Sequence, residues 1–175
     1  AAAVAAGDFT TGLEHAVKFG LPEFRAGVGI PVAVEKFQYG VASGDPETDS
    51  VVLWSQARPD DTSEIVAARW QVSTTADFSD IVASGVAQSS QSKDFTLKVV
   101  AEGLTAGTDY YYRFLYDGES SAIGQTKTLP EGSVDSLTFA IFSCTNYPAG
   151  FFNAYNAAVA NGFDYSIHLG DYIYE

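Results

Sequence analysis

Apolar and polar residues alternate in short runs along the middle of the chain, from about residue 36 to residue 130. In one such run Tyr110, Tyr112 and Phe114 occupy every second position, so in an extended strand they share one face. Runs of this kind, rich in Val, Thr, Tyr, Phe and Trp and bounded by turn residues, are typical of half-buried strands. We expect strands at residues 37–43, 50–57, 65–73, 81–86, 96–100, 110–116 and 122–128.

This succession of short strands predicts an all-β sandwich of two packed sheets. Turn signals such as Asp117-Gly118 lie between the runs. Trp54 and Trp70 fall inside predicted strands, and we expect both in the core of the sandwich. A carbohydrate-binding platform is the alternative role for these two rings. No catalytic group is visible in this segment.

The pattern changes after the Pro- and Gly-containing segment 129–133, which we interpret as a domain boundary. Residues 137–142 form a nearly continuous apolar run, as expected for a strand buried on both faces. Apolar residues then recur at helical spacing over 150–161, and a second apolar run covers 163–169. The order strand, helix, strand predicts a β-α-β unit with two parallel strands.

The expected organisation has three parts: an irregular amino-terminal segment (1–35), a β-sandwich domain (36–130) and the start of an α/β domain (131–175). The chain has no Met and opens on small residues like those near a signal-peptidase site, so we expect a processed, periplasmic or secreted protein. An arbitrary boundary is the alternative. No apolar run approaches the ~20 residues of a membrane-spanning helix, so no transmembrane anchor is expected.

Composition narrows the functional classes. The net charge of −13 with only nine Lys and Arg disfavours a nucleic acid as a stable partner, because phosphate contacts need a basic face. Hydrophobic residues make up 46% of the chain, which favours a packed core over disorder. The one cysteine, Cys144, cannot form an internal disulfide, so burial or metal binding must account for it.

The candidate chemistry lies where the two apolar strands of the α/β part end. Cys144 follows the first strand, and Gly170 and Asp171 follow the second. Neighbouring strands lie about 4.8 Å apart, and open α/β sheets bind ligands beyond the carboxyl ends of their strands. We therefore expect Cys144 and Asp171 side by side, with Tyr174 one short turn further on. A thiolate, a carboxylate and a phenolate favour ferric iron over a lone Mg or Ca ion.

Structural roles for the same residues remain open alternatives. Cys144 is then a small buried hydrophobe, Asp171 a helix cap and Tyr174 a core aromatic. Asn146 is a weaker candidate for contact with calcium or phosphate. His168 is interpreted as a packed histidine, or as one that orients a ligand.

These residues resemble a known family. The block Gly170–Tyr174 matches the Gly-Asp-x-x-Tyr block of purple acid phosphatases, in which the Tyr binds ferric iron. The fuller resemblance, over about residues 35–175, is to the alkaline phosphatase D family, and it is carried by Phe37–Pro46, Phe142–Tyr147, Gly150–Tyr155 and His168–Glu175. The segment Leu104–Tyr112 is similar to fibronectin type III domains, where a Tyr packs at a corner. The implied fold is a fibronectin III/Ig-like sandwich followed by the first β-α-β unit of an α/β metallophosphoesterase domain.

The resemblance implies an exported metal-dependent phosphatase and phosphodiesterase that uses ferric iron (Fe3+) with calcium (Ca2+). It maps Cys144, Asp171 and Tyr174 to iron ligands, with Asp171 bridging the ions and Cys144 in place of the Asp-x-His block of most metallophosphoesterases. The ions would polarise a phosphate ester and lower the pKa of the attacking water. The family's further Asn, Asp and His ligands have no counterpart here, so we expect a truncated catalytic domain that needs its remainder from later sequence or a companion chain.

Two other functions remain open. One is a phospholipase D-like phosphodiesterase on the same scaffold, which would differ only in its substrate pocket. The other is a non-catalytic, fibronectin-like binding module. The chemistry-bearing residues at 144–146 and 170–174 argue against a pure binding module.

Overall fold

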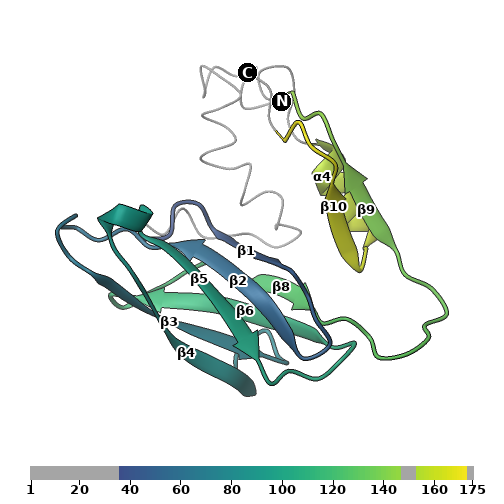
Figure 1. Cartoon of the computed structure of the whole chain (residues 1–175), viewed down its shortest axis with the longest axis horizontal. Coiled ribbons are helices and arrows are strands. Elements are labelled where there is room, and N and C mark those ends of the chain that lie inside the picture. Colours follow the sequence, from purple (N-terminus) through teal and green to yellow (C-terminus); the bar gives the residue numbers. More distant parts are fainter. Residues whose placement is uncertain (1–35, 147–152, 173–175) are drawn as a thin grey trace. The chain divides into compact units, whose positions relative to one another are not determined.

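The computed structural model describes residues 36–146 and 153–172 (Figure 1). Contacts divide the chain between Val134 and Asp135 into two compact units. Strands β1 to β8 belong to the unit before this division, and β9, helix α4 and β10 follow it. Among the described residues, no helix has the length and apolar character needed to cross a membrane.

The first unit is a sandwich of two antiparallel sheets. One sheet has the strand order β1 (Val41–Gly44), β2 (Ser50–Gln56), β5 (Thr96–Glu102). The other has the order β4 (Ile81–Ser89), β3 (Val66–Ser73), β6 (Asp109–Tyr116), with β7 (Glu119–Ser120) and β8 (Gly124–Lys127) both pairing with β6. A 3-10 turn, η2 (Gln91–Lys93), connects β4 to β5. The predicted two-sheet sandwich is confirmed.

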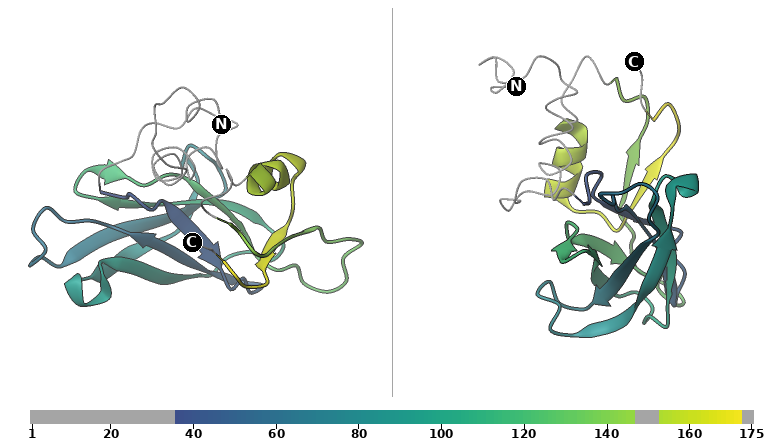
Figure 2. Two further views of the ribbon diagram at one scale, coloured as in Figure 1. Left: turned by 90° about the horizontal axis from the view of Figure 1, so that it is seen from above. Right: turned by 90° about the vertical axis from the view of Figure 1, so that its left-hand side faces the viewer.

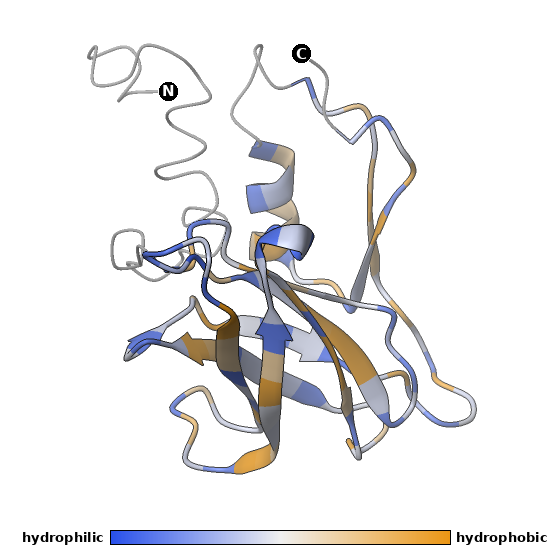
Figure 3. Cartoon of the chain, turned by 60° about the vertical axis from the view of Figure 1, so that its left-hand side comes forward, coloured by the Kyte–Doolittle hydropathy of each residue, from blue (hydrophilic) through white to orange (hydrophobic). Residues whose placement is uncertain are grey.

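Side-chain alternation places the core between the two sheets. Hydrophobic and hydrophilic positions alternate along the strands of the sandwich (Figure 3). Along β6, Tyr110, Tyr112 and Phe114 are 3%, 2% and 0% exposed, and the residues between them are only half-buried. The shared face predicted for these three aromatics is therefore the inner face.

Three details of the sandwich differ from the sequence prediction. The stretch from Phe37 to Gly40 is a turn and not the start of a strand, because the Gly40 amide donates to the Phe37 carbonyl at 3.3 Å. Phe37 still reaches the core, at 4% exposed. Trp54 lies half-buried on the outer face of β2, so the core role predicted for it is wrong. The two-residue strand β7 was not predicted.

Trp70 does pack against the core, as predicted, and its ring fills the space beside a glycine. A Cβ atom added to Gly85, its partner on β4, would lie 2.8 Å from the Trp70 ring. The same arrangement recurs at Gly124 of β8, where an added Cβ would overlap the ring of Tyr112. These glycines leave room for aromatic rings from the neighbouring strands.

Two buried hydroxyl groups fix the loop that precedes β6. The Thr105 amide donates to the Tyr110 hydroxyl at 2.8 Å. The Thr128 hydroxyl, which is fully buried, donates to the Thr105 carbonyl at 2.6 Å and accepts from the Thr108 amide at 3.0 Å. The Tyr at a corner that the sequence predicted is therefore present in this loop.

Replacing Tyr110 by Phe is expected to lower the free energy of unfolding of the sandwich by about 1–3 kcal/mol, because the Thr105 amide loses its acceptor. Chemical denaturation monitored by the fluorescence of Trp54 and Trp70 measures this change. The control is Tyr111→Phe, on the half-buried opposite face of β6, expected within about 0.5 kcal/mol of the wild type. Equal losses from the two variants would contradict a special role for the corner hydroxyl.

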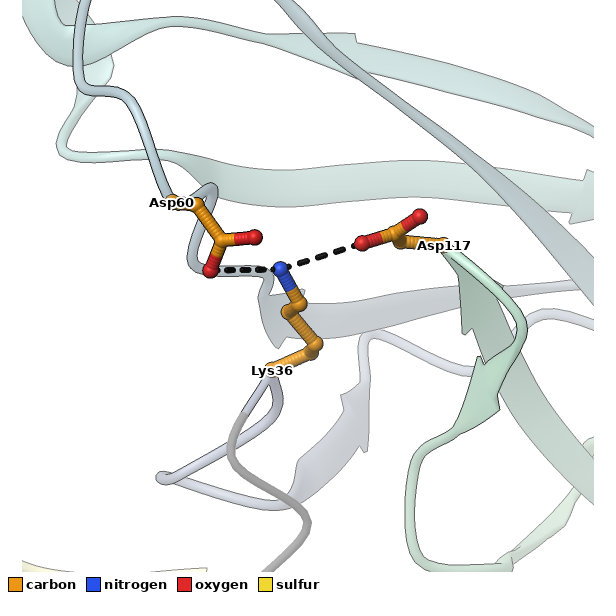
Figure 4. A network of polar contacts seen from close by, with 3 residues as sticks. All are labelled: Lys36, Asp60 and Asp117. Carbon is orange, nitrogen blue, oxygen red and sulfur yellow. Dashed lines mark ion pairs between the residues drawn. The ribbon is translucent and has the colours of Figure 1, made fainter.

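A lysine links three loops at one end of the sandwich (Figure 4). The Lys36 ammonium lies 2.9 Å from Asp60 Oδ1 and 3.1 Å from Asp117 Oδ2, and its side chain is only 9% exposed. The hydrogen bond to Asp60, helped by that to Asp117, raises the pKa of Lys36 above its ordinary value, although desolvation opposes this. The three residues line part of a hollow of about 470 Å³ together with Asp61, Glu64, Ala67 and Tyr116. Lys36 therefore supplies positive charge among the carboxylates of this hollow.

The second unit contains the predicted β-α-β arrangement. Strands β9 (Phe139–Phe142) and β10 (Tyr165–His168) are parallel neighbours, with Phe139 opposite Tyr165 and Phe142 opposite His168. Helix α4 (Asn153–Asn161) lies beside them (Figures 1 and 2). The ring of Tyr155 on α4 stacks on Phe142 at 4.3 Å between centroids, so the helix covers the face of the strands that carries Phe142. The prediction of parallel strands is confirmed. The expected burial of the first strand on both faces is not observed in this unit, because Phe139 and Ile141 are exposed on the face opposite Phe142.

Candidate metal centre

The pairing of β9 with β10 continues beyond the ends of both strands. The Cys144 amide donates to the Gly170 carbonyl at 3.3 Å, and the Thr145 amide donates to the Asp171 carbonyl at 3.2 Å. These bonds hold the two outgoing segments next to each other. The thiol of Cys144 consequently lies 3.8 Å from Asp171 Oδ2 and donates to it. The side-by-side placement expected for these two residues is therefore present.

Both candidate ligands sit on unusual backbone. Cys144 has φ 57° and Asp171 has φ 48°, and Gly170 between β10 and Asp171 has φ 113°. The left-handed conformation costs about 1–2 kcal/mol for most non-glycine residues, with Asp better tolerated than Cys. Such backbone persists only where the surrounding structure holds it, and it is concentrated at ligand and active sites. Among the described residues of the second unit, Cys144 and Asp171 are the only non-glycine positions with positive φ.

The exposure of the pair decides between two interpretations of the cysteine. Cys144 is exposed, as is Asp171. The alternative in which Cys144 is a small buried hydrophobe is therefore not what this unit shows. An accessible thiol beside a carboxylate offers one sulfur and one oxygen donor to a metal ion. Both side chains are of types that bind metal ions, iron among them.

The remaining predicted site residues are placed differently. Tyr174 lies outside the described residues. Asn146 is exposed and follows Cys144 by two positions. Within 36–146 and 153–172, His, Cys, Asp and Glu form no group of three or more that would hold a metal ion. Cys144 and Asp171 thus supply two donors, and a full coordination shell needs ligands from outside these ranges.

One contact near the site had not been predicted. The hydroxyls of Thr145 and Tyr155 lie 2.9 Å apart, and Tyr155 is the residue whose ring stacks on Phe142. This contact ties the segment just after Cys144 to helix α4. The only sequence signal for it is that Thr145 and Tyr155 fall in two consecutive blocks of the family resemblance.

Comparison with known proteins identifies the family. Residues 25–130 match the family described as PhoD-like phosphatase, N-terminal domain, and residues 139–175 match PhoD-like phosphatase. The chain belongs to the PhoD-like phosphatase family. Its resemblance to the alkaline phosphatase D family is thereby confirmed, and the second match begins at the first residue of β9.

Similar individual proteins agree with this assignment. Alkaline phosphatase D of Bacillus subtilis (strain 168) is 41% identical over an alignment of 147 residues, which covers 79% of this PhoD-like chain and 25% of that protein. A solved structure described as "Structure of PhoD" superposes with a TM-score of 0.75 at 39% identity, over 83% of this chain and 30% of the other. The PhoD-like chain therefore spans about a quarter of the length of its curated relative.

Proposed function

We propose that the full-length protein carrying this chain is an exported phosphoric ester hydrolase of the alkaline phosphatase D type, acting on phosphate monoesters and diesters. The observation that carries the proposal is the Cys144–Asp171 pair, 3.8 Å apart on left-handed backbone at the ends of two parallel strands. Membership of the PhoD-like phosphatase family supports the reaction class. Export is part of this proposal, and detection of the protein only in the cytoplasm would contradict it.

We further propose that the centre holds Fe3+ with Ca2+. Cys144, Asp171 and Tyr174 would bind the iron, Asp171 would be shared with a second ion, and Asn146 would contact calcium or phosphate. Anionic sulfur and oxygen donors favour the ferric state, whereas calcium takes oxygen ligands. When bound, the ions supply Lewis acidity that draws electron density from the phosphate oxygens and lowers the pKa of a water.

The chain's own residues set up this chemistry before any ion arrives. The ladder bonds from the amides of Cys144 and Thr145 fix the spacing of the two strand ends. The hydrogen bond between the hydroxyls of Thr145 and Tyr155 connects the segment that follows Cys144 to helix α4. The two donors are therefore preorganised, so less ordering entropy is lost when a metal and a phosphate bind.

Metal removal tests this proposal. Stripping the full-length protein with a chelator should lower hydrolysis of p-nitrophenyl phosphate and bis(p-nitrophenyl) phosphate by roughly 10²-fold or more, since metal Lewis acidity is worth several kcal/mol. Adding Fe3+ together with Ca2+ should restore the rate, and Mg2+ alone should not. Undiminished activity in protein confirmed to be metal-free would contradict the proposal. The ratio of the two rates separates a phosphatase from a phospholipase D-like phosphodiesterase.

A further inference from the structure

The structure assigns His168 as a positioning residue that holds Asp171 in its ligand-presenting conformation through the two residues flanking it, Gly170 and Tyr172. This inference rests on the proposed metal centre. His168 is the last residue of β10 and lies opposite Phe142, on the face of the strands that α4 covers.

The first contact is a hydrogen bond that fixes the tautomer of the imidazole. The Gly170 amide lies 3.3 Å from His168 Nδ1. A backbone amide only donates, so Nδ1 is the acceptor and carries no proton. The single proton of the neutral ring is then on Nε2. The ring therefore holds the backbone of Gly170, whose φ is 113°.

The second contact is with the ring on the other side of Asp171. The rings of His168 and Tyr172 lie 4.6 Å apart between centroids at an interplanar angle of 51°. The imidazole thus contacts both neighbours of Asp171 in the chain, Gly170 and Tyr172. Left-handed backbone at a non-glycine residue such as Asp171 persists only where its surroundings restrain it, and these contacts on either side of Asp171 contribute that restraint.

Neither of these contacts involves the other ring nitrogen, Nε2. His168 Nε2 is buried and has no hydrogen-bond partner among the described residues. A buried donor without an acceptor costs about 1–3 kcal/mol, so a histidine that served only for packing would be poorly chosen here. The bond that Nδ1 accepts from the Gly170 amide instead gives the histidine a role in orienting the neighbouring candidate ligand.

Two amide substitutions in the full-length protein separate the roles of the two nitrogens. His168→Asn keeps an acceptor near the position of Nδ1, and His168→Gln keeps a donor near the position of Nε2. Loss of a residue that orients a metal ligand typically costs 10–100-fold in metal affinity. We therefore expect the iron dissociation constant, measured by chelator competition, to rise about 10–100-fold in His168→Gln. It should rise by a clearly smaller factor in His168→Asn, which keeps the acceptor for the Gly170 amide but loses the ring that contacts Tyr172. Ser166→Ala, on the same face of β10, is the matched control and should leave the constant unchanged.

The unfolding temperature of each variant separates positioning from simple packing. If His168 variants lose stability but bind iron with wild-type affinity, or if Gln rather than Asn preserves the affinity, the assignment is wrong. If the wild-type protein itself binds no iron, the proposed metal centre fails, and that result is distinct from failure of the role given to His168.

Discussion

The full-length protein with Asp171 replaced by Asn is expected to lose bound iron and to hydrolyse phosphate esters at least about 10³-fold more slowly than wild type. The reason is that metal Lewis acidity stabilises the transition state by several kcal/mol, and each loss of about 1.4 kcal/mol slows the reaction tenfold. Asn keeps the size of the side chain and tolerates the left-handed φ of 48° found at this position. The substitution therefore removes the anionic donor while sparing the backbone. Steady-state kinetics and the iron content of the purified variant measure the two effects.

The control for this substitution is Asp135→Asn, which removes one exposed carboxylate from the same unit. Asp135 precedes β9 in the chain, whereas the candidate ligands follow the carboxyl ends of β9 and β10. It should leave iron content and kcat/KM unchanged, so a general effect of net charge is excluded. Wild-type turnover in Asp171→Asn would contradict the role given to this carboxylate.

Replacing Cys144 by Gly should separate metal binding from stability more sharply than any other change at the site. Glycine adopts the φ of 57° without strain, and this relief, about 1–2 kcal/mol, offsets the greater entropy of glycine in the unfolded chain. We expect unchanged or slightly higher stability together with loss of iron and a drop in activity of at least about 10²-fold. Thermal unfolding and iron analysis of the same preparation give both quantities.

Asp45→Gly provides the matched control, because Asp45 has a similar φ of 50° but belongs to the sandwich. It should relieve strain without changing iron content or activity. If Cys144→Gly instead unfolds the second unit while the folded fraction keeps full activity, Cys144 is a structural residue and not a ligand.

The placement of the site could be predicted because it follows from topology. Two continuous apolar runs separated by a helical pattern are compatible with parallel neighbours, and parallel strands deliver their carboxyl ends to one edge. The hydrogen bond from the Cys144 amide to the Gly170 carbonyl shows that the two strand ends do lie side by side. The ligand role of Tyr174 stays a prediction, since this residue lies outside the described ranges.

The backbone at the site could not be predicted to the same extent. Gly170 signals a tight turn and Asp tolerates positive φ better than most residues, but the residue type of Cys144 gives no such indication. The contacts of His168 with Gly170 and Tyr172 depend on that backbone, because only the turned chain brings the Gly170 amide to Nδ1. Because this backbone could not be predicted, the sequence alone did not decide whether His168 packs or orients a ligand.

The errors in the sandwich have a similar origin. Alternation identifies two faces of a strand but not which face is inner, and Trp54 fell on the outer face because Val51 and Leu53 take the core positions of β2. Phe37 and Tyr39 alternate as they would in a strand, yet Gly40 closes a turn there instead. Strand β7, with two residues, is too short to show a period.

Element analysis by plasma mass spectrometry of the natural, full-length protein, purified without chelator, tests the metal centre most directly. We predict near-stoichiometric iron together with calcium in the wild type, and loss of the iron in Asp171→Asn and Cys144→Gly. Folded wild-type protein that contains neither metal would contradict it. Cys144 and Asp171 would then be structural residues at the ends of β9 and β10, and the binding-module interpretation would be favoured.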